Sequence, residues 1–425
     1  MKMMKRLIAL GLSLLLLLFC FVGCSSKGPK MMKLGDSEIT LNLFYLYLSR
    51  MKGTYCATYG IGAEDDEHWD TVMDASGKTY NEYYTEFVLE QAKSYLAACH
   101  VFDELGLELP DSYVEEIDSE IDRMIEQEAD GSKKEFNKML AEFGANVAIL
   151  REAYLVEAKI AYLQDHLYGE KGGKIGGKAY EDYYQENYAR FKHILFTTFE
   201  YVYEEDENGD AIYYKTKDSS RISYDTEKGK ASDKKDINGD TIYLTEDGKI
   251  AYDKVNGQRR RMTNEDNTYQ TMPLSQERID QIRADVKLVH NEAVEGSYSV
   301  FDELVQDYYP EETYKNGYYI TKTSDTAWNE VRDKVFTMEK GEIAEIESDW
   351  GIHIVMRYEL EEAGYDNPDN ADFFISTQTG TYTFLPALKQ YLLSEYVKPY
   401  LEEIKLDEAI LKRADMKSVA PNFYY

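Results

Sequence analysis

Cysteine is scarce in this chain of 425 residues, which holds four cysteines and six histidines. No two cysteines have the CxxC spacing, and none stands at metal-ligand spacing from a histidine, so we predict no zinc site and no other bound metal. Cys20 lies in a leader segment and Cys24 at its end, which leaves Cys56 and Cys99 for the body of the mature chain. Those two thiols either pair outside the cell or stay reduced, with Cys99 on the apolar face of a helix.

Positive charge is also in deficit, with 48 lysines and arginines against 79 aspartates and glutamates. The formal net charge is −31, and removing the three cations Lys2, Lys5 and Arg6 with a leader leaves −34. So acidic a surface repels nucleic acid and an anionic bilayer, and we expect neither as a partner. The same charge keeps a protein soluble and favours basic, unfolded chains as binding partners.

The chain also lacks the regular alternation of strands and helices that a doubly wound solute-binding fold requires. Helical patterns gather in the first half, and short strand patterns gather after residue 190. This order predicts an α+β protein, in which a helical domain is followed by a domain of sheet and helices. A chain of this length has room for more than one hydrophobic core.

The N-terminus has the order of a secretory leader. A positive segment precedes the apolar residues 7–19, a run too short to favour a permanent membrane span. The run ends at Phe21-Val22-Gly23-Cys24, which resembles a bacterial lipobox, although Phe21 stands where leucine is usual. The resemblance implies a signal peptide at 1–23 and lipidation of Cys24, whose acyl chains would hold the protein stably at a membrane. The alternative is an ordinary secretory leader in which Cys24 is incidental.

Apolar side chains recur at helical spacing through the first half of the chain. Two stripes at this spacing are Leu43, Tyr47, Met51 and Tyr55, and then Val88, Ala92, Tyr95, Cys99 and Phe102. Gly106 and Gly144 suit helix ends, and Asn146 suits the start of a longer helix. We therefore predict a helical array at 35–190, behind a polar tether at 24–34.

Two short apolar segments in the second half each hold one histidine and predict β-strands. They are Lys192-His193-Ile194-Leu195-Phe196 and Trp350-Gly351-Ile352-His353-Ile354-Val355. An amphipathic helix at 276–293 and the turn Lys340-Gly341-Glu342-Ile343 lie between them. The residues alone allow two interpretations: both histidines belong to a site, or both are buried core residues of an α+β domain.

The order of these motifs resembles the parvulin family of peptidyl-prolyl isomerases, with its opening His-Ile-Leu, its Lys-Gly-Glu-Ile turn and its closing Gly-x-His-Ile-Val. The helical array resembles the chaperone domain of PrsA- and SurA-type extracytoplasmic foldases through Glu104-Leu105-Gly106-Leu107 and Tyr183-Tyr184-x-x-Asn187. We therefore expect a helical chaperone domain at 35–190 and a parvulin-like domain at 191–360. A C-terminal segment at 361–425 is expected to return to the helical domain.

The resemblance implies a membrane-anchored folding factor that catalyses peptidyl-prolyl cis–trans isomerisation in secreted proteins. Its partners would be unfolded or newly secreted polypeptides, its place the outer face of a bacterial cell membrane, and it would need no cofactor. The alternative is a holdase chaperone whose parvulin domain is catalytically degenerate.

The family's site residues carry over to named positions of this chain. The resemblance implies catalytic roles for His193 and His353, with the polar site residue at Glu311; Glu312 aligns nearly as well. The substrate-binding positions of the proline cup fall at Ala327, Val331, Phe336 and Met338.

Two of these positions depart from the family, which has methionine where Ala327 stands and phenylalanine where Val331 stands. Each lost side chain removes apolar contact worth about 1.5–3 kcal/mol. We therefore expect a wide, shallow cup and weak isomerase activity. On the same reasoning, Ala327→Met with Val331→Phe should raise the activity by restoring contact with proline.

Residues 199–274 interrupt the parvulin-like domain with a tandem repeat. The segment Asn208-Gly209-Asp210-Ala211-Ile212-Tyr213 recurs as Asn238-Gly239-Asp240-Thr241-Ile242-Tyr243. Asn-Gly favours a type I′ turn, so a small β appendage of hairpins is predicted. Calcium is the alternative interpretation, but an EF-hand needs glycine and glutamate where Ala211 and Lys217 stand. We therefore expect no metal here.

Overall fold

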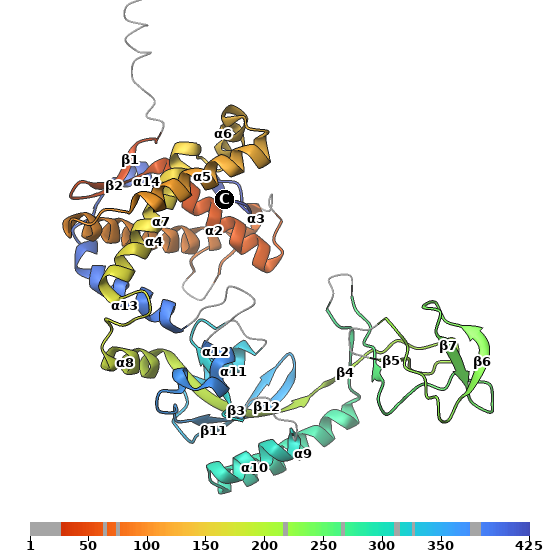
Figure 1. The fold of residues 1–425 in the computed structure, drawn as a ribbon. Helices are drawn as coiled ribbons and strands as arrows, with labels where there is room; N and C mark the ends of the chain where they lie inside the picture. Colours follow the sequence, from red (N-terminus) through yellow and green to blue (C-terminus); the bar gives the residue numbers. More distant parts are fainter. Residues whose placement is uncertain are drawn as a thin grey trace, which may run out of the picture. The chain divides into compact units, whose positions relative to one another are not determined.

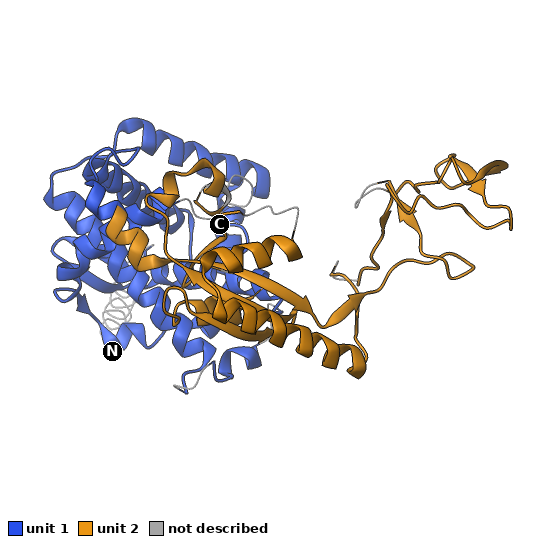
Figure 2. Cartoon of the chain, turned by 90° about the horizontal axis from the view of Figure 1, so that it is seen from below, with its two compact units in different colours: residues 1–180, 382–425 blue, residues 181–381 orange. Residues whose placement is uncertain are grey.

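The computed structural model describes residues 27–62, 66–73, 77–215, 220–264, 268–309, 315–324, 328–374 and 384–425. Cys24 and the leader predicted before it lie outside these residues. The chain folds into two compact units, one of residues 1–180 with 382–425 and one of residues 181–381 (Figure 2). The first unit is mainly helical and the second combines sheet and helices, so the predicted α+β class is confirmed.

The first unit consists of helices and one small sheet (Figure 1). Its helices are α2 (Leu41–Tyr59), α3 (Asp66–Asp70), α4 (Tyr80–Glu104), α5 (Asp111–Ala129), α6 (Lys133–Ala141), α7 (Val147–Tyr168), α13 (Phe384–Leu401) and α14 (Glu408–Leu411), with a 3-10 turn η3 (Met416–Ser418). The antiparallel sheet has the order β13 (Lys405–Leu406), β1 (Lys30–Leu34), β2 (Ser37–Thr40). Across the described ranges, no helix is both long enough and apolar enough to span a bilayer.

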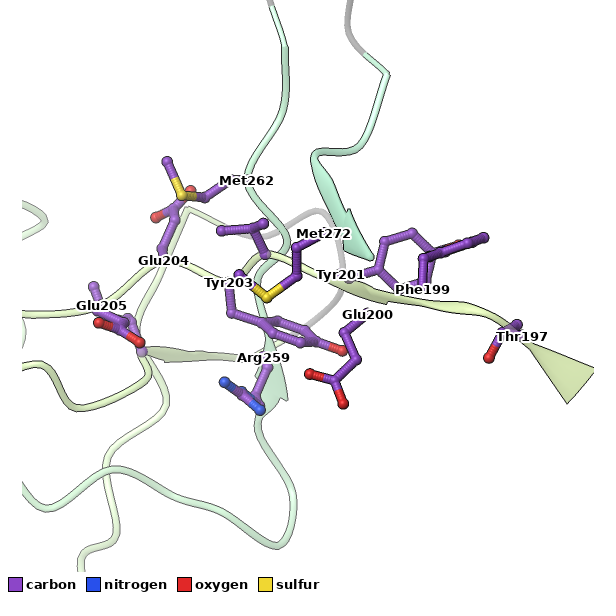
Figure 3. A pocket seen from close by; sticks show the side chains of 12 residues that line it. Thr197, Phe199, Glu200, Tyr201, Tyr203, Glu204, Glu205, Arg259, Met262 and Met272 are labelled. Atoms are coloured by element: carbon purple, nitrogen blue, oxygen red, sulfur yellow. The ribbon is translucent and has the colours of Figure 1, made fainter. Parts of the chain in front are cut away.

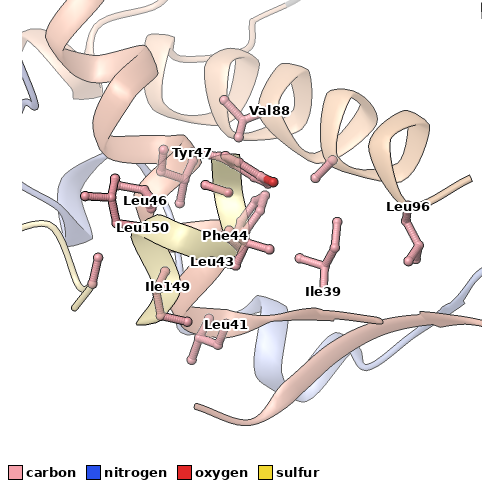
Figure 4. Close-up of a cluster of buried hydrophobic side chains, with 14 of the residues drawn as sticks. Ile39, Leu41, Leu43, Phe44, Leu46, Tyr47, Val88, Leu96, Ile149 and Leu150 are labelled. Carbon is pink, nitrogen blue, oxygen red and sulfur yellow. The ribbon is translucent and has the colours of Figure 1, made fainter. Parts of the chain in front are cut away.

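Side chains cap the helices of this unit where the backbone leaves N–H groups without helical partners. Thr79 and Glu82 form a reciprocal capping box at the start of α4. The side chain of Asn146 accepts hydrogen bonds from two backbone N–H groups at the start of α7. The apolar faces of α2, α4 and α7 then meet in one core, part of which is shown in Figure 4.

The C-terminal segment completes this core. Helix α13 packs on α4 and α7, and the chain then returns to α2. The backbone N–H of Asn422 donates to the Ser49 carbonyl at 2.9 Å. A Cβ at position 53 would lie 2.0 Å from the Asn422 carbonyl oxygen, so this close approach requires Gly53. Cys56 and Cys99 are both buried here, and no disulfide joins these two described residues.

The second unit contains a four-stranded antiparallel sheet. Its order is β10 (Tyr318–Thr321), β3 (Tyr188–Thr197), β12 (Gly351–Tyr358), β11 (Ile343–Ser348). Helix α8 (Gly177–Asn187), which crosses the boundary between the units, leads directly into β3. The other helices are α9 (Gln276–Glu295), α10 (Tyr298–Tyr308), α11 (Asn329–Val335) and α12 (Ala371–Phe374), with 3-10 turns η1 (Gly364–Asp366) and η2 (Pro368–Asn370).

Both faces of this sheet are covered. Successive strand residues point to opposite faces, so each strand contributes side chains to both. On one face, Ile194 and Ile354 pack with α9 and α10. On the other face, Phe191 and Val355 pack with Val331 of α11. Figure 1 shows α9 and α10 on one side of the sheet and α11 on the other. The positions of His193 and His353 place both histidines on the α11 face.

The insert is a set of short hairpins whose two repeats hold each other. Its strands pair as β4 (Phe199–Tyr201) with β9 (Thr271–Pro273), β5 (Tyr213–Tyr214) with β8 (Gln258–Arg259), and β6 (Lys230–Lys235) with β7 (Thr241–Leu244). The Tyr224 hydroxyl of the first repeat donates to Asp236 of the second at 2.9 Å. Reciprocally, the Tyr252 hydroxyl of the second repeat donates to Asp206 of the first at 3.2 Å. The two repeats are therefore joined by reciprocal side-chain hydrogen bonds.

The hairpin loops differ from the type I′ turns expected from Asn-Gly. Gly209 and Gly239 have φ values of 80° and 77°, whereas neither Asn208 nor Asn238 has the positive φ that a type I′ turn requires. The Asp206 carboxylate instead accepts hydrogen bonds from two N–H groups of its own loop. A three-residue loop that ends in a left-handed glycine explains this pattern, and the preceding aspartate stabilises it.

Candidate functional site

The two histidines meet across the central strands. His193 on β3 lies opposite Val355, and His353 on β12 lies opposite Leu195, so the histidines are diagonal neighbours on one face. Their Nδ1 atoms are 2.9 Å apart, and their rings are stacked with an interplanar angle of 12°. This register brings together two residues that are 160 positions apart in the sequence.

Ser348 at the end of β11 extends this pair into a chain of hydrogen bonds. Its Oγ lies 2.8 Å from Nε2 of His353 and also accepts the backbone N–H of Trp350 at 3.1 Å. Each neutral imidazole has one donor and one acceptor nitrogen. When Ser348 donates to His353, Nδ1 of His353 donates to His193, and the outer Nε2 of His193 then carries a proton. In the opposite direction, Nδ1 of His193 donates to Nδ1 of His353, and Nε2 of His353 donates to Ser348. The hydroxyl proton of Ser348 is then the one left for another acceptor.

Burial keeps both histidines neutral. Their exposed fractions are 6% for His193 and 0% for His353. Burial, followed by the proximity of His353, lowers the pKa of His193 from 6.5 to about 3. Burial lowers the pKa of His353 to about 4. At neutral pH the pair is therefore an uncharged, water-excluded set of donors and acceptors.

Aromatic rings enclose the pair. The Trp328 ring centroid lies 4.5 Å from that of His193 and 5.9 Å from that of His353. Tyr318 meets His193 edge-on, with centroids 5.2 Å apart and an interplanar angle of 90°. Trp328 immediately precedes α11 and occupies the space beside the histidines. The surroundings of the pair are thus apolar on the side of α11.

The predicted cup positions Val331, Phe336 and Met338 lie in or beside the core under α11. Val331 and Met338 have exposed fractions of 0% and 2% and belong to the core between α11 and the sheet. Phe336 is half-buried and packs against the same core. Val331 points inward because α11 presents Val331 and Val335 to the sheet, one helical turn apart. Val331 and Met338 thus have little exposed surface, and their roles in a proline cup stay predictions.

Three predicted positions cannot be placed. Glu311 and Glu312, offered as the polar site residue, and Ala327 of the cup all lie outside the described residues. Their assigned roles stay predictions.

Tyr309 is a site contact that the sequence reasoning missed. Its hydroxyl accepts the backbone N–H of Leu195 at 2.8 Å and lies 3.4 Å from the carbonyl oxygen of the same residue. Among the described residues, strand β10 pairs with β3 as far as Phe191. Tyr309 contacts β3 two residues from His193. The only signal in the sequence was the Tyr-Tyr pair that ends α10.

Comparisons with known proteins complete the description of the site. No family model matches the chain, and the search of curated proteins found no match. Among solved structures, the chain is similar to PrsA from Bacillus subtilis, with 14% identity, a TM-score of 0.18, and coverage of 82% of this chain and 94% of that chain. It is also similar to a PrsA peptidylprolyl isomerase from Bacillus anthracis, with 12% identity, a TM-score of 0.23, and coverage of 79% and 99%.

A third similar structure is the foldase protein PrsA from Streptococcus pneumoniae, with 13% identity, a TM-score of 0.18, and coverage of 80% and 97%. These three solved structures are PrsA proteins, the foldases that the sequence motifs resemble.

Proposed function

We propose that this chain is an extracytoplasmic protein-folding factor that catalyses peptidyl-prolyl cis–trans isomerisation. The observation that carries the proposal is the 2.9 Å contact between Nδ1 of His193 and Nδ1 of His353 on neighbouring strands, continued to Ser348. Below about pH 6.5 the two buried imidazoles reduce the stability of the fold, because the charged form of each is lost. A role in binding or catalysis accounts for keeping both.

The chemistry suits a neutral site. Amide resonance sets a barrier of about 18–20 kcal/mol to rotation about the X–Pro bond, and no covalent bond has to break. A catalyst needs to hold the twisted amide and stabilise its altered charge with fixed donors in an apolar setting. The Ser348–His353–His193 chain supplies such donors, and Trp328 and Tyr318 supply apolar surface beside them. We assign catalytic roles to His193 and His353, and a positioning role to Ser348.

The proposal includes attachment to the outer face of a bacterial membrane through lipidated Cys24. The Phe21-Val22-Gly23-Cys24 motif supports it. Mass spectrometry of the mature N-terminus should find acylated Cys24, and Cys24→Ser should release the protein from membranes. Cleavage at another residue would contradict this part.

The helical unit is proposed to bind unfolded or newly secreted polypeptides. Exposed aromatic side chains on α2 and α4 support this role: Tyr59, Tyr83 and Phe87 have exposed fractions of 63%, 37% and 47%. Such rings offer contact area to apolar segments that are still unfolded.

A second candidate function is a holdase chaperone whose parvulin-like domain does not catalyse. The complete burial of His353 and Val331 favours it, since a working site must admit a prolyl ring. An isomerisation assay on the purified mature chain separates the two functions. We expect weak but measurable turnover of a prolyl peptide.

The decisive variant in that assay is His353→Ala. We expect it to reduce kcat/KM by roughly tenfold or more, because a fixed donor in a water-excluded site contributes at least this much. His166→Ala, which removes an exposed histidine from the helical unit, is the matched control and should have no effect. Circular dichroism should show that both variants fold. Turnover no higher than background in the wild type, together with suppressed client aggregation, would establish the holdase instead.

A further inference from the structure

A cavity of about 970 Å³ lies in the insert, separate from the histidine pair (Figure 3). One wall is the chain segment that begins with β4 and carries Phe199, Tyr201 and Tyr203. Met262 and Met272 contribute from the segment that ends in β9. The two methionines are exposed by 37% and 50%. Methionine and tyrosine together form an apolar surface that adapts to varied side chains.

Arginines hold the tyrosines of this wall in place. The guanidinium of Arg261 lies 3.6 Å from the centroid of the Tyr201 ring, and that of Arg259 lies 3.8 Å from the Tyr203 ring. Cation–π contacts at these distances fix the orientation of the rings. Arg259 therefore lines the cavity, and Arg261 supports the Tyr201 ring of its wall.

The carboxylates of the cavity divide into one that is neutralised and two that are available. Glu204 is paired with Arg260 at 3.1 Å and accepts the Tyr214 hydroxyl at 2.7 Å. Glu200 and Glu205 are exposed, and among the described residues neither forms an ion pair. Arg259 keeps its positive charge over the Tyr203 ring, so Glu200 and Glu205 against Arg259 leave the lining with a net negative charge beside apolar surface. This combination fits a partner that has cations on an otherwise apolar or aromatic segment.

The cavity lies along the strand that leads away from the histidine pair. Strand β3 continues past His193 to its end at Thr197, and β4 begins at Phe199. The Phe199 ring packs against Trp350 of the β11–β12 turn, with centroids 6.0 Å apart. Six residues of extended chain span about 20 Å. One polypeptide therefore has the reach to occupy both places.

We propose that the cavity is an accessory binding site for the polypeptide whose prolyl bond is isomerised. It takes an extended segment that carries lysine or arginine side chains about six residues from the proline. The identity of the partner rests on the proposed isomerase function. The binding site itself is supported by the tyrosine–methionine wall and by Glu200 and Glu205.

The experiment compares twelve-residue prolyl peptides that carry three lysines, or three glutamates, about six residues from the proline, with the charged end placed on either side. Binding to the full mature chain is measured by fluorescence anisotropy at low and high salt. We expect the lysine peptide to bind more tightly than the glutamate peptide in at least one orientation. Salt should reduce this preference, because exposed charges are screened.

The variant is Glu200→Gln with Glu205→Gln, which should reduce the preference for lysine by roughly two- to tenfold, the range expected for two exposed ion pairs. The matched control is Glu227→Gln with Glu246→Gln, which removes the same charge from exposed positions of the insert outside the cavity lining. The control should keep the wild-type preference. Met272→Ala should weaken both peptides equally, since it removes only apolar surface.

The outcomes separate this proposal from the isomerase proposal. If no prolyl peptide is turned over but the lysine preference depends on Glu200 and Glu205, the cavity is a polypeptide site and the isomerase function is wrong. The accessory-site proposal alone is wrong if prolyl peptides are turned over but the lysine preference is absent. The same holds if the lysine preference is equal in the variant and the control.

Discussion

The two faces of the β3–β12 strand pair share one backbone but bury different kinds of side chain. Toward α9 and α10, Ile194, Ile352 and Ile354 are 0–1% exposed and entirely apolar. Toward α11, His193 and His353 are buried to a similar extent, at 6% and 0%. The lowered pKa of each histidine reflects the loss of its charged form on burial. Both faces bury apolar side chains, and only the face toward α11 also holds two polar rings within this strand pair.

At neutral pH, the largest expected effect comes from weakening the apolar face. Ile354→Ala should reduce the free energy of unfolding by about 2–5 kcal/mol, because it leaves a cavity between β12 and the two helices. Urea unfolding of the full chain, followed by tryptophan fluorescence, measures the change. A loss below about 1 kcal/mol would mean that this face does not carry the stability assigned to it.

An intermediate effect is expected on the histidine face at Val331. The sequence resemblance implied that Val331→Phe, with Ala327→Met, restores a proline cup. In the structure Val331 is fully buried against the sheet, so phenylalanine should overpack the core and cost about 1–3 kcal/mol. We expect no gain in isomerase activity from Val331→Phe alone. Increased turnover at unchanged stability would restore the original prediction.

The histidine face also predicts a pH dependence. The unfolded chain binds protons at both histidines below about pH 6.5, whereas the folded chain binds them only near pH 3–4. The free energy of unfolding should therefore decrease as pH falls from about 6.5 to about 4, by up to about 1.4 kcal/mol per pH unit for each histidine. Unfolding titrations of the wild type and His193→Gln measure the slope.

The substituted chain should show a shallower slope in that window. Aspartates whose pKa is lowered in the fold, such as Asp225 through backbone hydrogen bonds from its loop, lose their stabilising effect only at lower pH. Equal slopes between pH 4 and 6.5 would show that His193 is charged in the folded chain.

The smallest effect is expected from removing the insert. Replacing residues 200–273 with a short Gly-Ser loop should change the stability of the sheet by about 1 kcal/mol or less, because loop-closure entropy depends weakly on length. Circular dichroism and urea unfolding measure this. The replacement should at the same time abolish the lysine preference of the accessory site. Unfolding of the sheet would show that the insert belongs to its core.

Much of the local structure follows from the sequence. Helical spacing and the cap at Asn146 predicted the helices, because these signals are set within one or two turns. The short apolar segments around His193 and His353, rich in β-branched residues, likewise predicted two strands. The insert was visible as a repeat of thirty residues. Its loop type was not, since Asp206 competes for the N–H groups that a type I′ turn arranges differently.

Only the tertiary structure decided which of these parts meet. The register of β3 against β12 sets the contact between His193 and His353, and that register depends on packing across the whole sheet. The rotation of α11 buries Val331, and the fold brings the Tyr309 hydroxyl to the backbone of Leu195. Long-range contacts of this kind, like the approach of Asn422 to Gly53, arise from how elements pack together, and no local pattern in the sequence encodes them.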